Sequence, residues 1–142
     1  MLELLEQEYP ITENDFNEFE KFLKKTLPLE MKEFYLKYNG GQPSPSCVHD
    51  ENHLFPVSAF YSIEEMKKSL DWFDDESLPD EFKKGDLLAF AYFPGNGNYS
   101  LSLRKNDYGK VYFYVLEEKA TIYGEWNSFK EFINNFVEDT EE

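Results

Sequence analysis

The sequence lacks paired cysteines, a basic surplus and long apolar runs, and each absence excludes a class of protein. Cys47 is the only cysteine, so the chain has no internal disulfide and no sign of an oxidising compartment. The N-terminus lacks the basic start and continuous apolar run of a secretory signal. No stretch reaches the length of a membrane span, about 20 apolar residues. We therefore expect a cytoplasmic protein.

Basic residues are scarce relative to acidic ones. The chain has 14 Lys and Arg against 29 Asp and Glu, which leaves a formal net charge of −15. This surplus repels nucleic-acid phosphates and anionic lipid headgroups, so neither nucleic acid nor a membrane is an expected partner. The same charge attracts a basic protein at long range, but it also serves simply to keep a protein in solution. Both interpretations stay open at this point.

Apolar residues are plentiful enough for one hydrophobic core. Hydrophobic residues make up 41% of the chain and aromatic residues 18%, mostly 14 Phe and 10 Tyr. At 142 residues, this composition predicts a single domain over the whole chain, without a linker or an internal repeat. Only the two ends, residues 1–10 and 138–142, are expected to fray.

Helices are predicted where a capping residue precedes apolar side chains at helical spacing. Three helices begin with capping-box spacing, at Thr12/Asp15, Ser62/Glu65 and Ser128/Glu131. A fourth follows Leu27-Pro28 and is expected to end in a glycine cap at Asn39-Gly40-Gly41. The side chains that these four helices are expected to bury are Phe16, Phe19, Phe22 and Leu23; Met31, Phe34, Tyr35 and Tyr38; Ile63, Met66, Leu70 and Phe73; and Phe129, Phe132, Ile133, Phe136 and Val137.

Antiparallel strands are predicted between the third helix and the last one. The segments 86–93, 98–103 and 110–116 are apolar or alternating, and glycine turns separate them. The turn at Gly95-Asn96-Gly97 lies between two strands and lacks a following helix and lysine, which favours a hairpin over a phosphate-binding loop. We place Tyr99, Leu101 and Leu103 on one face and Val111, Phe113 and Val115 on another. Shorter strands are expected at 54–60, where Pro56 requires an edge, and at 120–123, with a loop at 42–53.

This order of elements indicates an α+β fold, a single domain in which an antiparallel meander packs against N- and C-terminal helices. Four segments stand out in this order: Leu27-Pro28 to Gly41, Phe60 to Glu65, Gly95 to Tyr99 with Tyr108 to Phe113, and Asn127 to Phe132. Together they resemble the SUKH superfamily, which includes the yeast cell-wall synthesis regulator and many bacterial immunity proteins encoded beside secreted toxins. The resemblance implies a sheet packed on helices and a role in binding proteins, often a nuclease or other toxin domain, with no catalytic residues.

The chemically most capable side chains are Cys47, His49 and His53, which lie within one short stretch. Zinc accepts such ligands, but structural zinc usually draws two ligand pairs from separate segments. A nucleophile needs a base in contact and a third group that orients the base, and nothing in the sequence indicates either. A solvated polar loop is therefore the favoured interpretation, with no metal, no cofactor and no enzymatic activity expected.

The acidic stretch around Asp74 is the predicted protein-binding surface. Its carboxylates would steer a basic partner, and an exposed aromatic side chain would anchor it. The competing interpretation places Trp72 and Phe73 in the core and leaves the acids to solvate a loop. The candidate binding residues are Asp71, Trp72, Asp74, Asp75, Glu76, Asp80 and Glu81.

Three functional hypotheses follow from these observations. The first is an immunity protein, a monomer or weak homodimer, that neutralises a basic toxin domain by occluding it. The second is a regulatory scaffold of the yeast type, which binds several endogenous proteins with exchangeable contacts. The third, an enzyme or small-ligand domain, requires a deep pocket with convergent polar groups.

Overall fold

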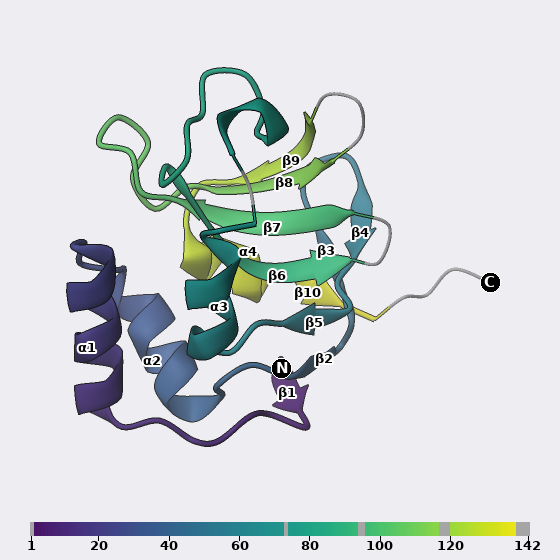
Figure 1. Ribbon diagram of the computed structural model, residues 1–142. Helices are drawn as coiled ribbons and strands as arrows, with labels where there is room; N and C mark the ends of the chain where they lie inside the picture. Colours follow the sequence, from purple (N-terminus) through teal and green to yellow (C-terminus); the bar gives the residue numbers. More distant parts are fainter. Residues whose placement is uncertain (1, 73, 94–95, 117–119, 139–142) are drawn as a thin grey trace.

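The largest element is a five-stranded antiparallel sheet with the strand order β5-β6-β7-β8-β9 (Figure 1). The computed structural model describes residues 2–72, 74–93, 96–116 and 120–138. The meander predicted from the sequence is confirmed, and β9 is longer than expected. The strands are β5 (Ala59–Phe60), β6 (Leu87–Phe93), β7 (Gly97–Ser102), β8 (Val111–Val115) and β9 (Thr121–Trp126).

Two smaller antiparallel sheets include residues that were expected to form loops or to fray. The strand β1 (Glu3–Leu5) pairs with β2 (Gln42–Ser44), so part of the N-terminal end is held in a sheet. The strand β3 (Cys47–His49) lies between β4 (Leu54–Pro56) and β10 (Phe136–Val137). The prediction of a loop over 42–53 is therefore wrong, because Cys47 and Val48 are buried and their backbone joins a ladder. Pro56 does lie on an edge strand, as predicted.

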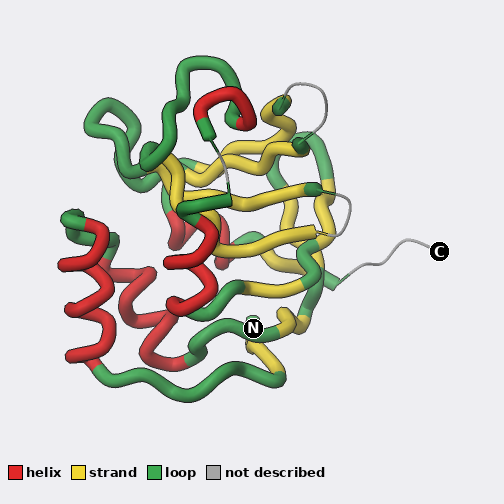
Figure 2. The backbone as a smooth tube through the Cα atoms, viewed as in Figure 1, coloured by secondary structure: helices red, strands yellow, loops and turns green. Residues whose placement is uncertain are grey.

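The described residues form four α-helices and one short 3-10 helix (Figure 2). The predicted capping boxes at Thr12 and Ser62 are both present with reciprocal hydrogen bonds. Two side chains that were expected to be buried are exposed: Phe22, which is 56% exposed and lies against the Lys67 ammonium group, and Val137, which is 37% exposed. The helices are α1 (Glu13–Leu23), α2 (Leu29–Lys37), α3 (Ile63–Ser69), α4 (Phe129–Asn134) and the 3-10 turn η1 (Asp75–Ser77).

Two helix ends differ from the prediction. The last helix stops at Asn134, and Phe136 and Val137 continue as β10, where they pair with β3. The cap of α2 is Tyr38, which is extended, so the expected left-handed glycine cap is wrong. Gly40 and Gly41 have φ values of +86° and +128°, and a Cβ there would lie 2.8 Å from the Ser62 nitrogen and 2.5 Å from the Leu5 oxygen. These glycines allow close backbone approach after the helix has ended.

The three central strands of the five-stranded sheet are buried on both faces, but different segments cover the two faces. Tyr99 pairs with Phe113 and Leu101 with Val111, so these side chains share one face, and their predicted placement on two faces is wrong. This inner face joins the main core with α4 and β3. On the outer face, Tyr112 and Tyr114 pack with Leu78 and Phe82 from residues 74–86, a segment that arches above β8 and β9 in Figure 1.

Asn39 ties the N-terminal segment to α2 and α3. Its side chain is buried, its Nδ2 donates to the Tyr9 carbonyl at 2.7 Å, and its Oδ1 accepts from the Ile63 N–H at 3.0 Å. Its own N–H donates to the Gln7 Oε1 at 2.9 Å. The sequence indicated only a helix stop at this position, and the structure adds a junction of three segments.

Candidate functional site

The residues Cys47, His49 and His53 are not brought together as a metal site. Cys47 is 4% exposed inside the three-stranded sheet, whereas both histidines are exposed. Among the residues that the structure describes, no group of three or more His, Cys, Asp or Glu could hold a metal ion. A buried thiol among apolar neighbours is also poorly placed to attack a substrate. His53 instead lies with its Nδ1 3.9 Å from the Asp50 Oδ1 in the β3–β4 turn.

A cleft of about 480 Å³ runs beside this turn, between β9 and α4. Four carboxylates line it, and the described residues that line it include no Lys or Arg. The residues that line the cleft are mostly charged or polar, unlike the apolar pockets that hold small ligands. Its lining residues are His49, Asp50, Glu51, Glu125, Trp126, Asn127, Glu131 and Asn135.

The acidic segment, residues 71–86, presents most of the predicted binding residues to solvent. Trp72 is 50% exposed, so it is not part of the core, while Phe73 lies outside the described residues. Leu78 and Phe82 are each 6% exposed and pack on the outer face of the sheet. The segment is thus anchored by these two apolar side chains, and Phe82, an aromatic residue interleaved with the predicted binding residues, is buried and not exposed. The exposed acidic residues are Asp71, Asp74, Asp75, Glu76, Asp80 and Glu81.

Local hydrogen bonds fix the backbone of the acidic segment. The Asp75 Oδ1 accepts from the Lys84 N–H at 2.6 Å and so closes the segment into a loop. The Ser77 hydroxyl donates to the Asp74 Oδ1 at 2.9 Å at the start of the 3-10 turn. Near the other end, the Asp86 Oδ2 accepts from the Lys83 N–H at 2.8 Å. Three carboxylates therefore stabilise the loop itself and are not only solvating groups.

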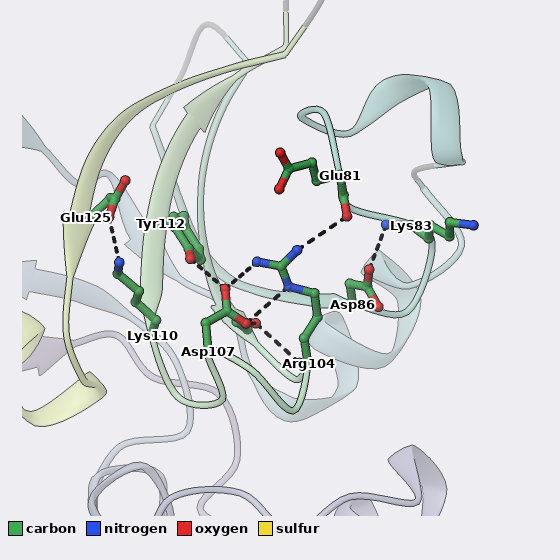
Figure 3. A network of polar contacts seen from close by, with 9 residues as sticks. Glu81, Lys83, Asp86, Arg104, Asp107, Lys110, Tyr112 and Glu125 are labelled. Atoms are coloured by element: carbon green, nitrogen blue, oxygen red, sulfur yellow. Dashed lines mark hydrogen bonds and ion pairs between the residues drawn. The ribbon is translucent and has the colours of Figure 1, made fainter.

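A polar network, the Arg104–Asp107 clasp, holds the segment against the sheet (Figure 3). Arg104 lies after β7, and its guanidinium bonds the Asp107 carboxylate through Nη2 at 2.5 Å and Nε at 3.1 Å. The same guanidinium stacks 3.9 Å from the Phe82 ring centroid, and its Nη1 donates to the Glu81 carbonyl at 3.3 Å. The clasp thus links the β7–β8 loop to the acidic segment through one cation.

The carboxylate of Asp107 is the electrostatic centre of the clasp. Its oxygens also accept hydrogen bonds from the Ser102 and Tyr112 hydroxyls, each at 2.5 Å. Burial alone raises the pKa of Asp107, but the hydrogen bonds and the Arg104 charge outweigh burial and hold this pKa well below its ordinary range. Burial and the neighbouring carboxylate raise the pKa of Tyr112. The Asp107 carboxylate of the folded protein is therefore ionised at all but strongly acidic pH.

The sequence pattern gave no sign of this clasp. Asn106 to Gly109 predicts a turn, and the turn is present, but Arg104, Asp107 and Tyr112 come from positions that a turn or strand pattern does not distinguish. The spacing of Arg104 and Asp107, three residues apart in a loop, does not by itself predict a clasp. The arrangement as a whole can display carboxylates rigidly, and it assembles no nucleophile–base pair among the predicted candidates.

The fold is of the α+β class, with antiparallel sheets packed against helices. A model of the SMI1 / KNR4 family (SUKH-1) matches residues 10–135, and the chain belongs to this family. The chain is also similar to the immunity protein YxxD of Bacillus subtilis (strain 168), with 27% identity over 114 residues. That match covers 77% of this chain and 73% of the Bacillus protein. No helix among the described residues is long and apolar enough to cross a membrane.

Proposed function

We propose that this protein is an immunity protein that binds a basic toxin domain and blocks it by occlusion. The observation that carries the proposal is the acidic segment, which is held rigidly by Leu78, Phe82 and the Arg104–Asp107 clasp while its carboxylates face solvent. Membership of the SUKH-1 family and similarity to a protein named as an immunity protein supply the class. The role proposed is non-enzymatic.

Charge and rigidity both favour tight binding of a basic partner. A net charge of −15 raises the rate of encounter with a basic domain and makes this rate fall as salt increases. A loop that is already ordered loses little conformational entropy when a partner docks on it. An immunity protein needs fast and tight association, because its target is lethal to the cell that makes it.

The experiment uses the toxin gene expected beside the gene of this protein. Co-expression should protect cells, and calorimetry should show one tight complex. The triple variant Asp71→Lys, Glu76→Lys, Glu81→Lys should weaken binding by about a hundredfold or more, because each reversal turns attraction into repulsion. These side chains are exposed and make none of the clasp contacts through their carboxylates.

A matched control reverses the same number of charges elsewhere. Glu3, Glu8 and Glu33 are exposed and belong to the N-terminal segment and α2, at the opposite end of the molecule from η1 in Figure 1. Their reversal should lower the association rate modestly and leave protection intact. Equal loss in the two triple variants would show that only net charge matters. Capture of several housekeeping proteins without one dominant partner would favour the regulatory scaffold instead.

A further inference from the structure

Three aromatic rings form a continuous, partly exposed surface beside the acidic segment. Tyr61 and Tyr92 are stacked with ring centroids 5.2 Å apart and an interplanar angle of 23°. Trp72 meets Tyr61 edge-on at 5.5 Å, with an angle of 72°. Trp72 is 50% exposed and the two tyrosines are half-buried. We call these three rings the aromatic platform.

The platform is ordered by the scaffold around it. The Tyr61 N–H donates to the Phe90 carbonyl at 2.7 Å, and the Tyr61 carbonyl accepts from the buried Tyr35 hydroxyl at 2.7 Å. The Tyr92 carbonyl accepts from the Ser58 N–H at 2.8 Å where β5 meets β6. These bonds hold the backbone of the two tyrosines, and the ring contacts themselves restrict the side chains, so the rings lose less freedom when a ligand binds, which is the property of an interface anchor.

Two carboxylates, those of Glu65 and Asp71, belong to the surroundings of the platform. Burial raises the pKa of Tyr61 to about 12, with further contributions from Tyr92, the Glu65 carboxylate and Tyr114. Asp71 directly precedes Trp72, and its side chain is 87% exposed. One cation is near: the Lys84 ammonium lies 3.9 Å from the Asp71 carboxylate, a loose surface pair. A positively charged group that reaches the rings therefore meets favourable charge as well as aromatic faces.

The protein itself contains a guanidinium group that is stacked on an aromatic ring, the kind of contact that such a surface favours. The Arg104 guanidinium stacks on Phe82 at 3.9 Å, and a carboxylate holds its edge. The guanidinium is planar and more weakly hydrated than an ammonium group, so it stacks on aromatic faces while its N–H groups bind carboxylates. The platform offers comparable groups, a half-exposed Trp72 beside the stacked tyrosines and the exposed Asp71 carboxylate next to it in the chain.

We propose that the aromatic platform of Tyr61, Tyr92 and Trp72 receives an arginine side chain of the basic protein partner, with Asp71 at its rim. This inference rests on the proposed function, since it requires a basic protein partner, and it names the anchor point of that partner. The exposed carboxylates steer the partner, and the rings supply short-range affinity that salt does not remove.

The first test measures the platform without the partner. Octa-arginine and octa-lysine peptides carry equal charge, so a surface that responds to charge alone binds them equally. The wild-type protein should bind octa-arginine at least about threefold more tightly in calorimetry at physiological salt. Trp72→Ala should remove this preference and Trp72→Phe should retain part of it. Equal binding of the two peptides by the wild-type protein would overturn the proposal.

A matched control and the toxin assay separate this inference from the proposed function. Tyr9 is 86% exposed on the N-terminal segment, and only its backbone carbonyl bonds Asn39, so Tyr9→Ala should change nothing. Trp72→Ala should weaken toxin binding by about tenfold or more, mainly through faster dissociation. Wild-type affinity and protection in the Trp72→Ala variant would reject the platform while the immunity role stands. Failure of the wild-type protein to bind the toxin would reject the immunity role itself.

Discussion

The two faces of the five-stranded sheet are buried by different means. On the inner face, Tyr99, Phe113 and Trp126 pack on Phe132 and other apolar residues in one continuous aromatic core. On the outer face, two apolar anchors, Leu78 and Phe82, and the Arg104–Asp107 clasp hold a segment whose other side chains are mostly acidic and exposed. The inner face therefore contributes most of the packing that stabilises the fold, whereas the outer face holds a charged segment with few apolar contacts.

The largest loss of stability is expected from a substitution in the inner face. Phe132 is fully buried, and its ring lies 5.0 Å from Trp126 and 5.3 Å from Phe90. Phe132→Ala removes a large side chain and leaves a cavity, so the free energy of unfolding should fall by about 3–5 kcal/mol. Urea unfolding followed by far-UV circular dichroism measures this change. A loss below about 1 kcal/mol would contradict the account of the inner core.

A smaller effect is expected from the outer face. Phe82 is buried on one side by Tyr112, with ring centroids 5.3 Å apart, and on the other by Arg104. Phe82→Ala should cost about 2 kcal/mol and should loosen residues 74–86 more than the sheet. Hydrogen exchange should therefore speed up in the acidic segment and stay slow in β7 and β8. Equally faster hydrogen exchange in all segments would show that the outer face is not a separate, less stable layer.

The clasp makes the outer face sensitive to acid. The pKa of Asp107 is lowered in the folded protein from an ordinary value of 3.8, so this carboxylate stabilises the fold above that value. The stabilisation is lost as pH falls below about 4 toward the folded-state pKa. Asp107→Asn should therefore be less stable than the wild type at pH 7, and the gap should narrow with acidification. Unfolding curves at several pH values test this, and a constant gap would argue against it.

The smallest effect on stability is expected from a variant that should change partner binding and leave the fold intact. The triple reversal of Asp71, Glu76 and Glu81 changes exposed carboxylates that hold no clasp bond, so unfolding should shift by no more than about 0.5 kcal/mol. The same variant should lose partner binding strongly. A thermal unfolding scan beside the binding assay checks both expectations, and a large loss of stability would place these carboxylates in the architecture of the segment.

Sequence patterns predicted the elements whose causes are local. The capping boxes at Thr12 and Ser62 and the meander after Asp86 follow from neighbouring residues, and the structure confirms them. Patterns failed where distant segments decide the outcome. β3 is a strand because β4 and β10 pair with it, and Phe136 leaves the last helix for the same reason. No local rule reports such pairing.

The candidate surface was predictable in part for similar reasons. Clustered like charge and proline marked residues 74–81 as exposed, and their carboxylates do face solvent. The anchoring of Phe82 under Arg104 depends on a contact between residues on separate segments, and the stacking of Tyr61 on Tyr92 depends on the β5–β6 pairing. These tertiary contacts decide which aromatic rings are left exposed, so the platform could not be identified before the fold was known.

The most direct test is hydrogen–deuterium exchange of this protein, free and in complex with the basic toxin domain that we propose as its partner. We expect partner binding to slow amide hydrogen exchange in residues 71–86 and in the paired strands β5 and β6 next to Tyr61 and Tyr92. Protection confined to the cleft between β9 and α4, with an unchanged acidic segment, would contradict it.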